Sequence, residues 1–499
     1  MKKTLRNSLA VLTLLAGGEA MFAQAIDWPT FGGDIERSGQ GKSEIKITKD
    51  EVTKNFKLLW KMQQRGTPSL MAPLVLGRLI GYRGFKELAF FGGSDDSLYV
   101  MDADMDRLYW QTKFVPPINA PAPTAECPGG MTAMPSLIPV SVRRSHPSTR
   151  KRFEAGFGGP RSIYLISSDG MLRRVNVANG NESGMPFQIF PANSRVSALN
   201  IDEGMIYATT SHGCGGAGNG VWGIDLATPD PSTAPEVTTL MTGPANYAGI
   251  GGPVIGKDGD VFVQTLDGPN DPANGKYSNA LLALEPKTLA VKGYFIDSSS
   301  GSAPKGDLNS VTPVTFEYKD HEVIASVSRD GHLNLLDEKS LAAQGDHKTP
   351  LAQSPRIPTG NDGGLWGSLT TWADPADKTR YILATVWGNA SGRNGSIAAY
   401  KLEEKDGKTV FTPVWTMPNL IRPVPPVVIG GLAFVLSSGE GRKNAVLHVV
   451  DSLTGTPVWS TKNEITAPGN LTPLTVANGR VYLVTADSTV WVFGLPLEL

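Results

Sequence analysis

The two cysteines of the chain, Cys127 and Cys214, both lie in glycine-rich segments, and His212 stands two residues before the second cysteine. Thiolate and imidazole groups are ligands that zinc prefers, but a closed zinc site needs a fourth ligand, and none is evident nearby. Outside the cytoplasm, an even number of cysteines favours a disulfide. We therefore expect a Cys127–Cys214 disulfide and no metal, with a metal site at these three residues as the alternative.

A second set of residues suits the binding of a flat or polar ligand. The glycine-rich segments 360–367 and 387–394 carry two tryptophans together with amide, carboxylate and guanidinium groups. Indole rings stack on flat ligands, and a few polar groups then fix the orientation. The expected ligand-binding residues are His212, Asp362, Trp366, Trp387, Asn389 and Arg393. The alternative is that glycine and asparagine serve turn geometry and that the tryptophans pack between neighbouring units.

No catalytic residue is assigned, because the sequence contains no G-x-S-x-G, P-loop or H-E-x-x-H motif. The net charge of -1 excludes the broad positive surface that nucleic acid or an anionic membrane would need. We therefore expect no nucleic-acid partner.

An internal repeat supplies the elements that must position these loops. Residues 90–102 read as an apolar strand, a Gly/Asp turn and an alternating strand that ends in Asp, and residues 108–110 begin a further strand. The other copies lie at 163–176, 205–225, 261–284, 323–337, 381–400, 433–451 and 481–493. A period of about 55 residues, with another apolar strand before each copy, is typical of four-stranded propeller blades. We predict an all-β chain that forms a single propeller of eight blades.

Propeller geometry predicts which loops lie together. The loop that leads into each blade and the loop between its second and third strands share one face of the ring. Cys127, Cys214 and the expected ligand-binding residues all map to such loops. We therefore expect one functional face, around the central channel, on which the longest loops gather.

The two ends of the repeat array predict how the ring closes. The eighth copy stops before its outer strand, and residues 56–62 offer a spare strand with Trp60 where other copies carry a tryptophan. We expect this strand to pair into the last blade, which removes an exposed sheet edge. The alternative is an irregular N-terminal tail. Residues 26–499 then form one propeller domain.

The first 25 residues have the features of a signal peptide. Lys2, Lys3 and Arg6 precede a short apolar run at 9–15, and Ala23 and Ala25 offer small residues for cleavage. We expect cleavage after Ala25, with Ala23 as the alternative. No later segment has the length of apolar sequence that spans a membrane. The mature protein is expected to be a periplasmic or secreted monomer.

The repeats resemble those of the pyrroloquinoline quinone (PQQ)-type propeller superfamily. Residues 451–459, Asp-Ser-Leu-Thr-Gly-Thr-Pro-Val-Trp, are the closest match, and residues 102–110 match in part. Residues 27–34, followed by Arg37-Ser38-Gly39, are similar to the start of exported proteins of this superfamily. The resemblance implies that the repeat Trp and Gly dock adjacent blades. It implies little about function, because the repeat residues are structural.

Two branches of that superfamily give two expectations of function. Quinone-dependent alcohol dehydrogenases of this superfamily typically carry two adjacent cysteines that stack on PQQ, with carboxylate and amide ligands for calcium. This chain has no Cys-Cys pair and no haem motif, which counts against an alcohol dehydrogenase but not against quinoproteins that lack the pair. The other branch contains binding propellers, including the lipoprotein that assists outer-membrane barrel assembly. We expect a non-enzymatic binding or scaffold module of the cell envelope, with an envelope protein or a small molecule as its partner. The alternatives are a PQQ-dependent oxidoreductase that uses PQQ and calcium, and a lyase or hydrolase on the same scaffold.

Overall fold

The computed structural model describes most of the chain. The described residues are 27–41, 47–81, 84–115, 122–138, 161–227, 232–296, 308–338, 341, 347–360 and 362–496. The predicted signal peptide, residues 1–25, lies outside them.

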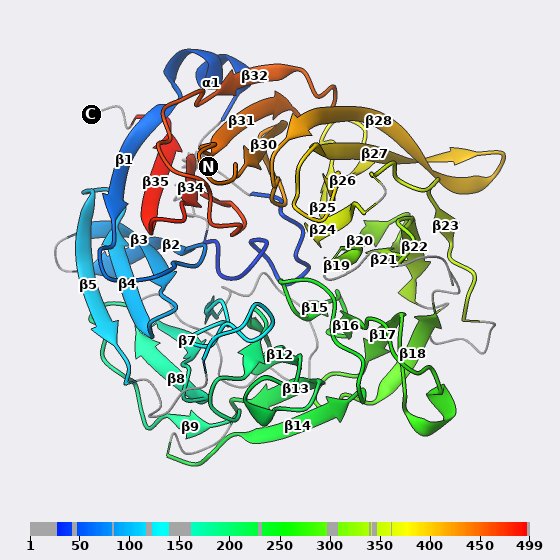
Figure 1. Cartoon of the computed structure of the whole chain (residues 1–499), viewed down its shortest axis with the longest axis horizontal. Coiled ribbons are helices and arrows are strands. Elements are labelled where there is room, and N and C mark those ends of the chain that lie inside the picture. The colour runs from blue at the N-terminus through cyan, green and yellow to red at the C-terminus, as the bar shows by residue number, and fades with distance from the viewer. Residues whose placement is uncertain are drawn as a thin grey trace, which may run out of the picture.

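The described strands form eight sheets that stand around one axis as the blades of a propeller (Figure 1). The first four blades, with the inner strand first, are β2 (Leu74–Gly81), β3 (Gly84–Gly92), β4 (Ser97–Asp102) and β5 (Arg107–Lys113); β6 (Ser136–Leu137), β7 (Ser162–Ile166), β8 (Met171–Asn176) and β9 (Phe187–Gln188); β10 (Arg195–Val196) and β11 (Asn200–Asp202) with β12 (Met205–Ser211), β13 (Gly220–Asp225) and β14 (Glu236–Met241); and β15 (Val254–Ile255), β16 (Val261–Gln264), β17 (Ala280–Leu284) and β18 (Val291–Ile296).

The other four blades complete the ring and confirm the predicted number. They are β20 (Val314–Tyr318), β21 (His321–Val327), β22 (Leu333–Asp337) and β23 (Ala352–Gln353); β24 (Gly364–Ser368) and β25 (Thr370–Ala373) with β26 (Arg380–Trp387), β27 (Gly395–Lys405) and β28 (Lys408–Leu420); β29 (Val427–Ile429), β30 (Leu432–Ser437), β31 (Val446–Asp451) and β32 (Pro457–Ser460); and β33 (Thr475–Ala477), β34 (Arg480–Val484), β35 (Thr489–Gly494) and β1 (Lys57–Gln63). A short strand, β19 (Ser310–Thr312), pairs in parallel with β24 across the boundary of blades 5 and 6.

Neighbouring blades dock through the tryptophan and glycine of the repeat. The indole N–H of Trp110 in blade 1 donates to the carbonyl of Val177 in blade 2 at 3.0 Å. A Cβ atom on Gly180 would come within 2.7 Å of that indole, so a side chain there would push the blades apart. Trp415 and Gly455 repeat this contact between blades 6 and 7, where the Cβ distance would be 2.8 Å. The docking role that the resemblance implied is therefore present.

The ring closes as the sequence predicts. Strand β1 pairs antiparallel with β35 and becomes the outer strand of blade 8. Trp60 is buried and meets the ring of Tyr482 edge-on, with 6.3 Å between the ring centroids. The helix α1 (Lys49–Asn55), capped by the Thr48 hydroxyl, precedes β1 and packs beside β32.

Residues 27–41 form what we call the axial strap, which runs along the inner strands from blade 1 to blade 7. It lies near the centre of the ring in Figure 1, in dark blue. Its hydrogen bonds follow the chain order of the blades: Trp28 with Val75, Pro29 with Leu137, Thr30 with Leu199, Ile35 with Ile255, Glu36 with Thr315, Ser38 with Thr371, and Gly39 with Val428. Since β1 belongs to blade 8, the strap and β1 together contact every blade. The strap was not predicted from the sequence.

Arg37 anchors the strap. Its side chain is fully buried and donates to the Thr30 hydroxyl at 2.6 Å and to the carbonyls of Phe31 and Leu199 at 2.8 and 3.2 Å. Burial lowers the pKa of Arg37 to about 9. Within the part of the chain that the structure describes, no helix is long and apolar enough to cross a membrane.

Candidate functional site

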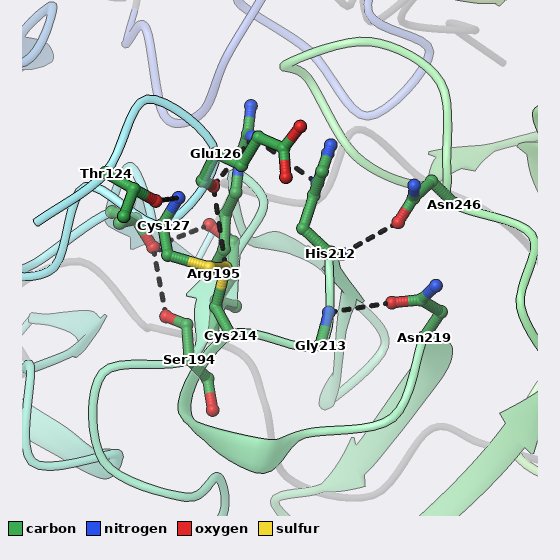
Figure 2. The surroundings of a disulfide bond; sticks show 12 residues. Thr124, Glu126, Cys127, Ser194, Arg195, His212, Gly213, Cys214, Asn219 and Asn246 are labelled. Atoms are coloured by element: carbon green, nitrogen blue, oxygen red, sulfur yellow. Dashed lines mark hydrogen bonds between the residues drawn. A yellow bond between two sulfur atoms is a disulfide. The ribbon is translucent and has the colours of Figure 1, made fainter. Parts of the chain in front are cut away.

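The disulfide ties two loops of one face together. We call this face the loop face, because it carries the loops that lead into the blades and the loops between second and third strands. Cys127 lies before blade 2 and Cys214 between β12 and β13 of blade 3, and their sulfurs are bonded, with the Cα atoms 5.5 Å apart (Figure 2). The predicted disulfide is therefore present. Because both sulfurs are bonded to each other, the alternative metal site loses its two thiolates.

His212 lies beside this disulfide and is held by the backbone and by neighbouring side chains (Figure 2). Its amide N–H donates to the Asn246 side chain at 2.7 Å, and its Nδ1 atom lies 3.3 Å from a guanidinium nitrogen of Arg195. The residue has a left-handed φ of 63°. His212 therefore belongs to the region around the disulfide, which we call the disulfide sector, in blades 2 and 3.

Trp366 and Trp387 form a stacked pair in blade 6. Trp366 lies in the inner strand β24 and Trp387 at the end of β26, and their ring centroids are 4.8 Å apart with an angle of 12° between the planes. The two strands pair at their loop-face ends, which brings the indoles together. Trp387 is only 7% exposed, and its indole N–H donates to the Pro423 carbonyl at 2.9 Å. Trp366 is partly buried, packs against the core cluster of blades 7, 8 and 1, and keeps some accessible surface.

Arg422 completes this stack and was missed in the sequence. Its guanidinium carbon lies 5.7 Å from the centroid of the Trp387 ring, within range of a cation–π contact. A Cβ atom on Gly392 would contact both Arg422 and Trp387 at 2.7 and 3.0 Å, so the three pack closely. The sequence could have indicated Arg422 only through its position, because it directly precedes Pro423, whose carbonyl accepts the Trp387 indole N–H.

The polar residues that the sequence predicts beside the indoles lie in the neighbouring loops of blade 6, and their side-chain contacts mainly hold these loops in shape. The Asn389 side-chain oxygen accepts the amide N–H groups of Ser391 and Arg393, each at 3.0 Å, which shapes its own turn. The Arg393 side chain bridges to Glu440 of blade 7 at 2.9 Å. Asp362 is exposed at the start of β24. We call these residues, with Trp366, Trp387 and Arg422, the indole sector.

The ring separates the two sectors. The disulfide sector belongs to blades 2 and 3 and the indole sector to blades 6 and 7, which lie on different sides of the axis in Figure 1. The structure therefore places the expected residues on one face but gathers them into two sites. His212 does not join the others.

Another buried arginine of the loop face was missed. Arg329 follows β21 and is 5% exposed. It donates to the Leu308 carbonyl at 2.6 Å and pairs with Asp267 at 2.9 Å, joining blades 4, 5 and 6 near the axis. Comparison of the repeats could have indicated it, because the Asp-Gly turn is preceded by Arg329 in blade 5 and by Ser168 at the same place in blade 2.

Comparisons with known proteins agree with this geometry. Residues 393–494 match the family model described as outer membrane protein assembly factor BamB. A europium-containing methanol dehydrogenase superposes with a TM-score of 0.62 at 12% identity, over 94% of this chain and 98% of its own. The fold is a PQQ-like β-propeller. A quinohemoprotein alcohol dehydrogenase from Comamonas testosteroni (TM-score 0.58, 12% identity, 95% of this chain and 82% of that one) has the same fold.

A binding propeller is similar as well. BamB from Moraxella catarrhalis superposes with a TM-score of 0.51 at 15% identity, over 89% of this chain and 99% of its own. No curated protein sequence matches the chain. At these identities the structural likenesses show the fold alone, so they leave open whether this PQQ-like propeller is a scaffold or a dehydrogenase.

The donor groups around the indoles do not fit a quinone held with calcium. Asn389 uses its side-chain oxygen within its own turn, and Asp362 is the expected carboxylate there. Calcium takes six to eight oxygen ligands, so one exposed carboxylate does not make a site. Among the described residues, three carboxylates converge within 4.8 Å elsewhere, at Asp258, Glu322 and Glu338 between blades 4 and 5. No chemical step through PQQ is therefore derived for this propeller.

Proposed function

We propose that this PQQ-like propeller is an exported, non-catalytic binding module of the cell envelope. Its ligand presents a flat aromatic or guanidinium group to Trp366. The observation that carries the proposal is the stacked indole pair, in which Trp387 is buried and Trp366 keeps some accessible surface. Stacking on indole gives affinity, and neighbouring polar groups give orientation.

The two indoles have different roles in this proposal. Trp387 is covered by Trp366 and Arg422 and uses its N–H on a backbone carbonyl, so it supports the site. Trp366 offers the ligand a ring whose position is fixed by that support. Preorganisation of this kind reduces the entropy lost on binding.

The partner is an envelope protein or a small molecule, and the protein acts as a monomer. The BamB-type match begins at Arg393 and continues through blades 7 and 8, so it includes part of the indole sector. The ring residues hold the blades together, and the loops are free to differ between proteins that share the fold.

Calorimetric titration of the purified mature protein with two flat probes, PQQ with calcium and flavin mononucleotide, tests this proposal. We expect saturable binding of at least one probe, a loss of about tenfold in affinity in Trp366→Ala, and no quinone-dependent dye reduction. The control Trp387→Phe keeps a stacked ring but loses the indole N–H, and should lower the melting temperature more than the affinity. Dye reduction that needs quinone and calcium would establish the oxidoreductase instead. Unchanged affinity in Trp366→Ala, or no binding of either probe, contradicts the site.

A further inference from the structure

A cavity of about 350 Å³ opens on the loop face where the ring closes, between blades 8 and 1. One wall comes from the segment after β1, and the other from the loop-face ends of β4 and β5. The cavity is lined by Arg65, Asp95, Ser97, Tyr99, Gln111 and Lys113, among others. The volume is within the range of sites for small molecules, and none of these residues belongs to the indole or the disulfide sector.

The charges around this cavity leave one cation available. Lys113 pairs with Asp95 through a 2.9 Å contact, and the same Asp95 oxygen accepts the Ser97 hydroxyl at 3.0 Å. Arg65 is exposed on the opposite wall and has no carboxylate within ion-pair distance among the described residues. Two cations and one carboxylate give the cavity a net positive charge. A guanidinium binds carboxylate and phosphate oxygens through two parallel hydrogen bonds.

The remaining lining is polar and uncharged. Gln111, which pairs with Tyr99 across β4 and β5, contributes an amide on the face of the blade that carries Tyr99. The hydroxyl of Tyr99, also in the wall, shares a hydrogen bond of 2.5 Å with the Thr67 hydroxyl, which links the wall of the cavity to the segment after β1. Amide and hydroxyl groups arranged around a small volume suit a ligand with several hydroxyls of its own.

We propose that this cavity binds a small polyhydroxylated molecule with one anionic group, with Arg65 on the anion and Gln111 on the hydroxyls. A carboxylated sugar and a phosphorylated sugar share this chemistry. Because Arg65 follows β1 of blade 8 while Lys113 belongs to blade 1, a bound ligand contacts both blades. Such a ligand stabilises the folded protein by an amount that rises with the logarithm of its concentration once the site is mostly occupied.

Titration of the full mature protein with glucuronate, glucose 6-phosphate and glucose, by calorimetry and by thermal unfolding, tests the proposal. We expect at least one anionic sugar to bind saturably and to raise the melting temperature, and glucose to bind about tenfold more weakly or not at all. The two anionic arms separate a carboxylate from a phosphate as the recognised group. Equal binding of glucose, or no saturable binding of either anion, overturns the proposal.

Matched variants locate the binding. Arg65→Gln should weaken the anionic sugar about tenfold, because it removes a charged hydrogen-bond donor from an exposed position. Gln111→Ala removes the amide from the β5 wall and should also weaken the binding of the anionic sugar. Arg442→Gln, an exposed cation of blade 7, and Trp366→Ala should leave the affinity unchanged. Unchanged binding in both Arg65→Gln and Gln111→Ala overturns the cavity as its location, whatever the outcome at Trp366.

Discussion

The boundary between blades 8 and 1 and the boundary between blades 4 and 5 use equivalent positions of the repeat with opposite charge. Arg480 begins β34 in blade 8, and Asp260 directly precedes β16 in blade 4. Each faces the next blade, where Glu87 of β3 and Glu322 of β21 occupy corresponding places near the start of the second strand. One boundary is therefore ion-paired and the other is rich in carboxylates.

At the boundary of blades 8 and 1 the charges are matched. Arg480 pairs with Glu87 and with Asp104, each at 2.9 Å, and the side chains of Arg480 and Glu87 are 6% and 4% exposed. Asn478 donates to the same Glu87 carboxylate at 2.8 Å, and the Tyr482 hydroxyl donates to its other oxygen. Although burial opposes it, the charge of Glu87 raises the pKa of Arg480.

At the boundary of blades 4 and 5 a carboxyl group is kept neutral instead. Asp260 pairs with Lys292, and Glu322 accepts the Lys257 amide N–H, which leaves Glu338 beside both carboxylates. Burial, together with hydrogen bonds to Asp260 and Glu322 and their negative charge, raises the pKa of Glu338 from 4.5 to about 8. Below that pH the extra negative charge is absent.

The difference follows from how the blades are connected. Blades 4 and 5 are consecutive in the chain, so their contact needs little help from charge pairs. In blade 8 the chain runs from β1 into blade 1, but β33, β34 and β35 come from the other end of the chain and meet β1 and blade 1 through noncovalent contacts alone. The pairing of β1 with β35 and the Arg480 network hold these strands in the ring. This closure therefore concentrates specific buried contacts, whereas the boundary of blades 4 and 5 tolerates a titratable cluster.

The largest effect should come from breaking the paired boundary. Glu87→Ala leaves the Arg480 guanidinium buried without its main partner, and loss of one member of a buried ion pair costs about 3–5 kcal/mol. We expect the free energy of unfolding to fall by that amount, measured by denaturant unfolding at neutral pH.

The pairing itself is tested by a double variant. Arg480→Met in the Glu87→Ala background removes the stranded charge, so the double variant should be more stable than Glu87→Ala alone. If the double variant is as unstable as the sum of both single variants, the two residues do not act as a pair.

Sequence reasoning predicted the repeat because its signal is local and recurs, as in Asp451 to Trp459. It also predicted β1 and the disulfide, since propeller geometry places the two cysteines on one face. It missed the axial strap because its hydrogen bonds go to seven segments far apart in sequence. It placed Trp366 and Trp387 together but could not tell which ring stays accessible, since that depends on Arg422 and on the Pro423 carbonyl.

A smaller effect is expected from replacing the titrating carboxyl group of Glu338 at the boundary of blades 4 and 5, which we call the acidic boundary. The pKa of Glu338 is raised in the folded state, so between pH 4.5 and about 8 this carboxyl group is protonated in the folded protein and ionised in the unfolded chain. The free energy of unfolding therefore falls as the pH rises through that window. Glu338→Gln keeps a hydrogen-bond donor without the charge. It should be nearly neutral at pH 4.5 and stabilising by about 1–2 kcal/mol above pH 8, with allowance for solvent screening of a half-buried group. A difference that is the same at both pH values in chemical unfolding would show that Glu338 does not titrate there.

The smallest effect should come from Asp258, the exposed member of the same cluster. Its carboxylate oxygen lies within 4.8 Å of those of Glu322 and Glu338. Asp258→Asn should stabilise the protein by about 0.5 kcal/mol above pH 8 at low salt, because exposed charges interact weakly and salt screens them.

The interaction between Asp258 and Glu338 decides whether this small gain belongs to the cluster. In a double-variant cycle, Asp258→Asn should gain less stability in the Glu338→Gln background, because the charge that it repels has already gone. Glu464→Gln removes an exposed carboxylate outside the cluster and controls for the change in net charge. A gain that is the same in both backgrounds, or the same for Glu464→Gln, would mean that the protein responds to its total charge. In that case the acidic boundary would not differ electrostatically from the rest of the surface, and the contrast with the Arg480 boundary would rest on burial alone.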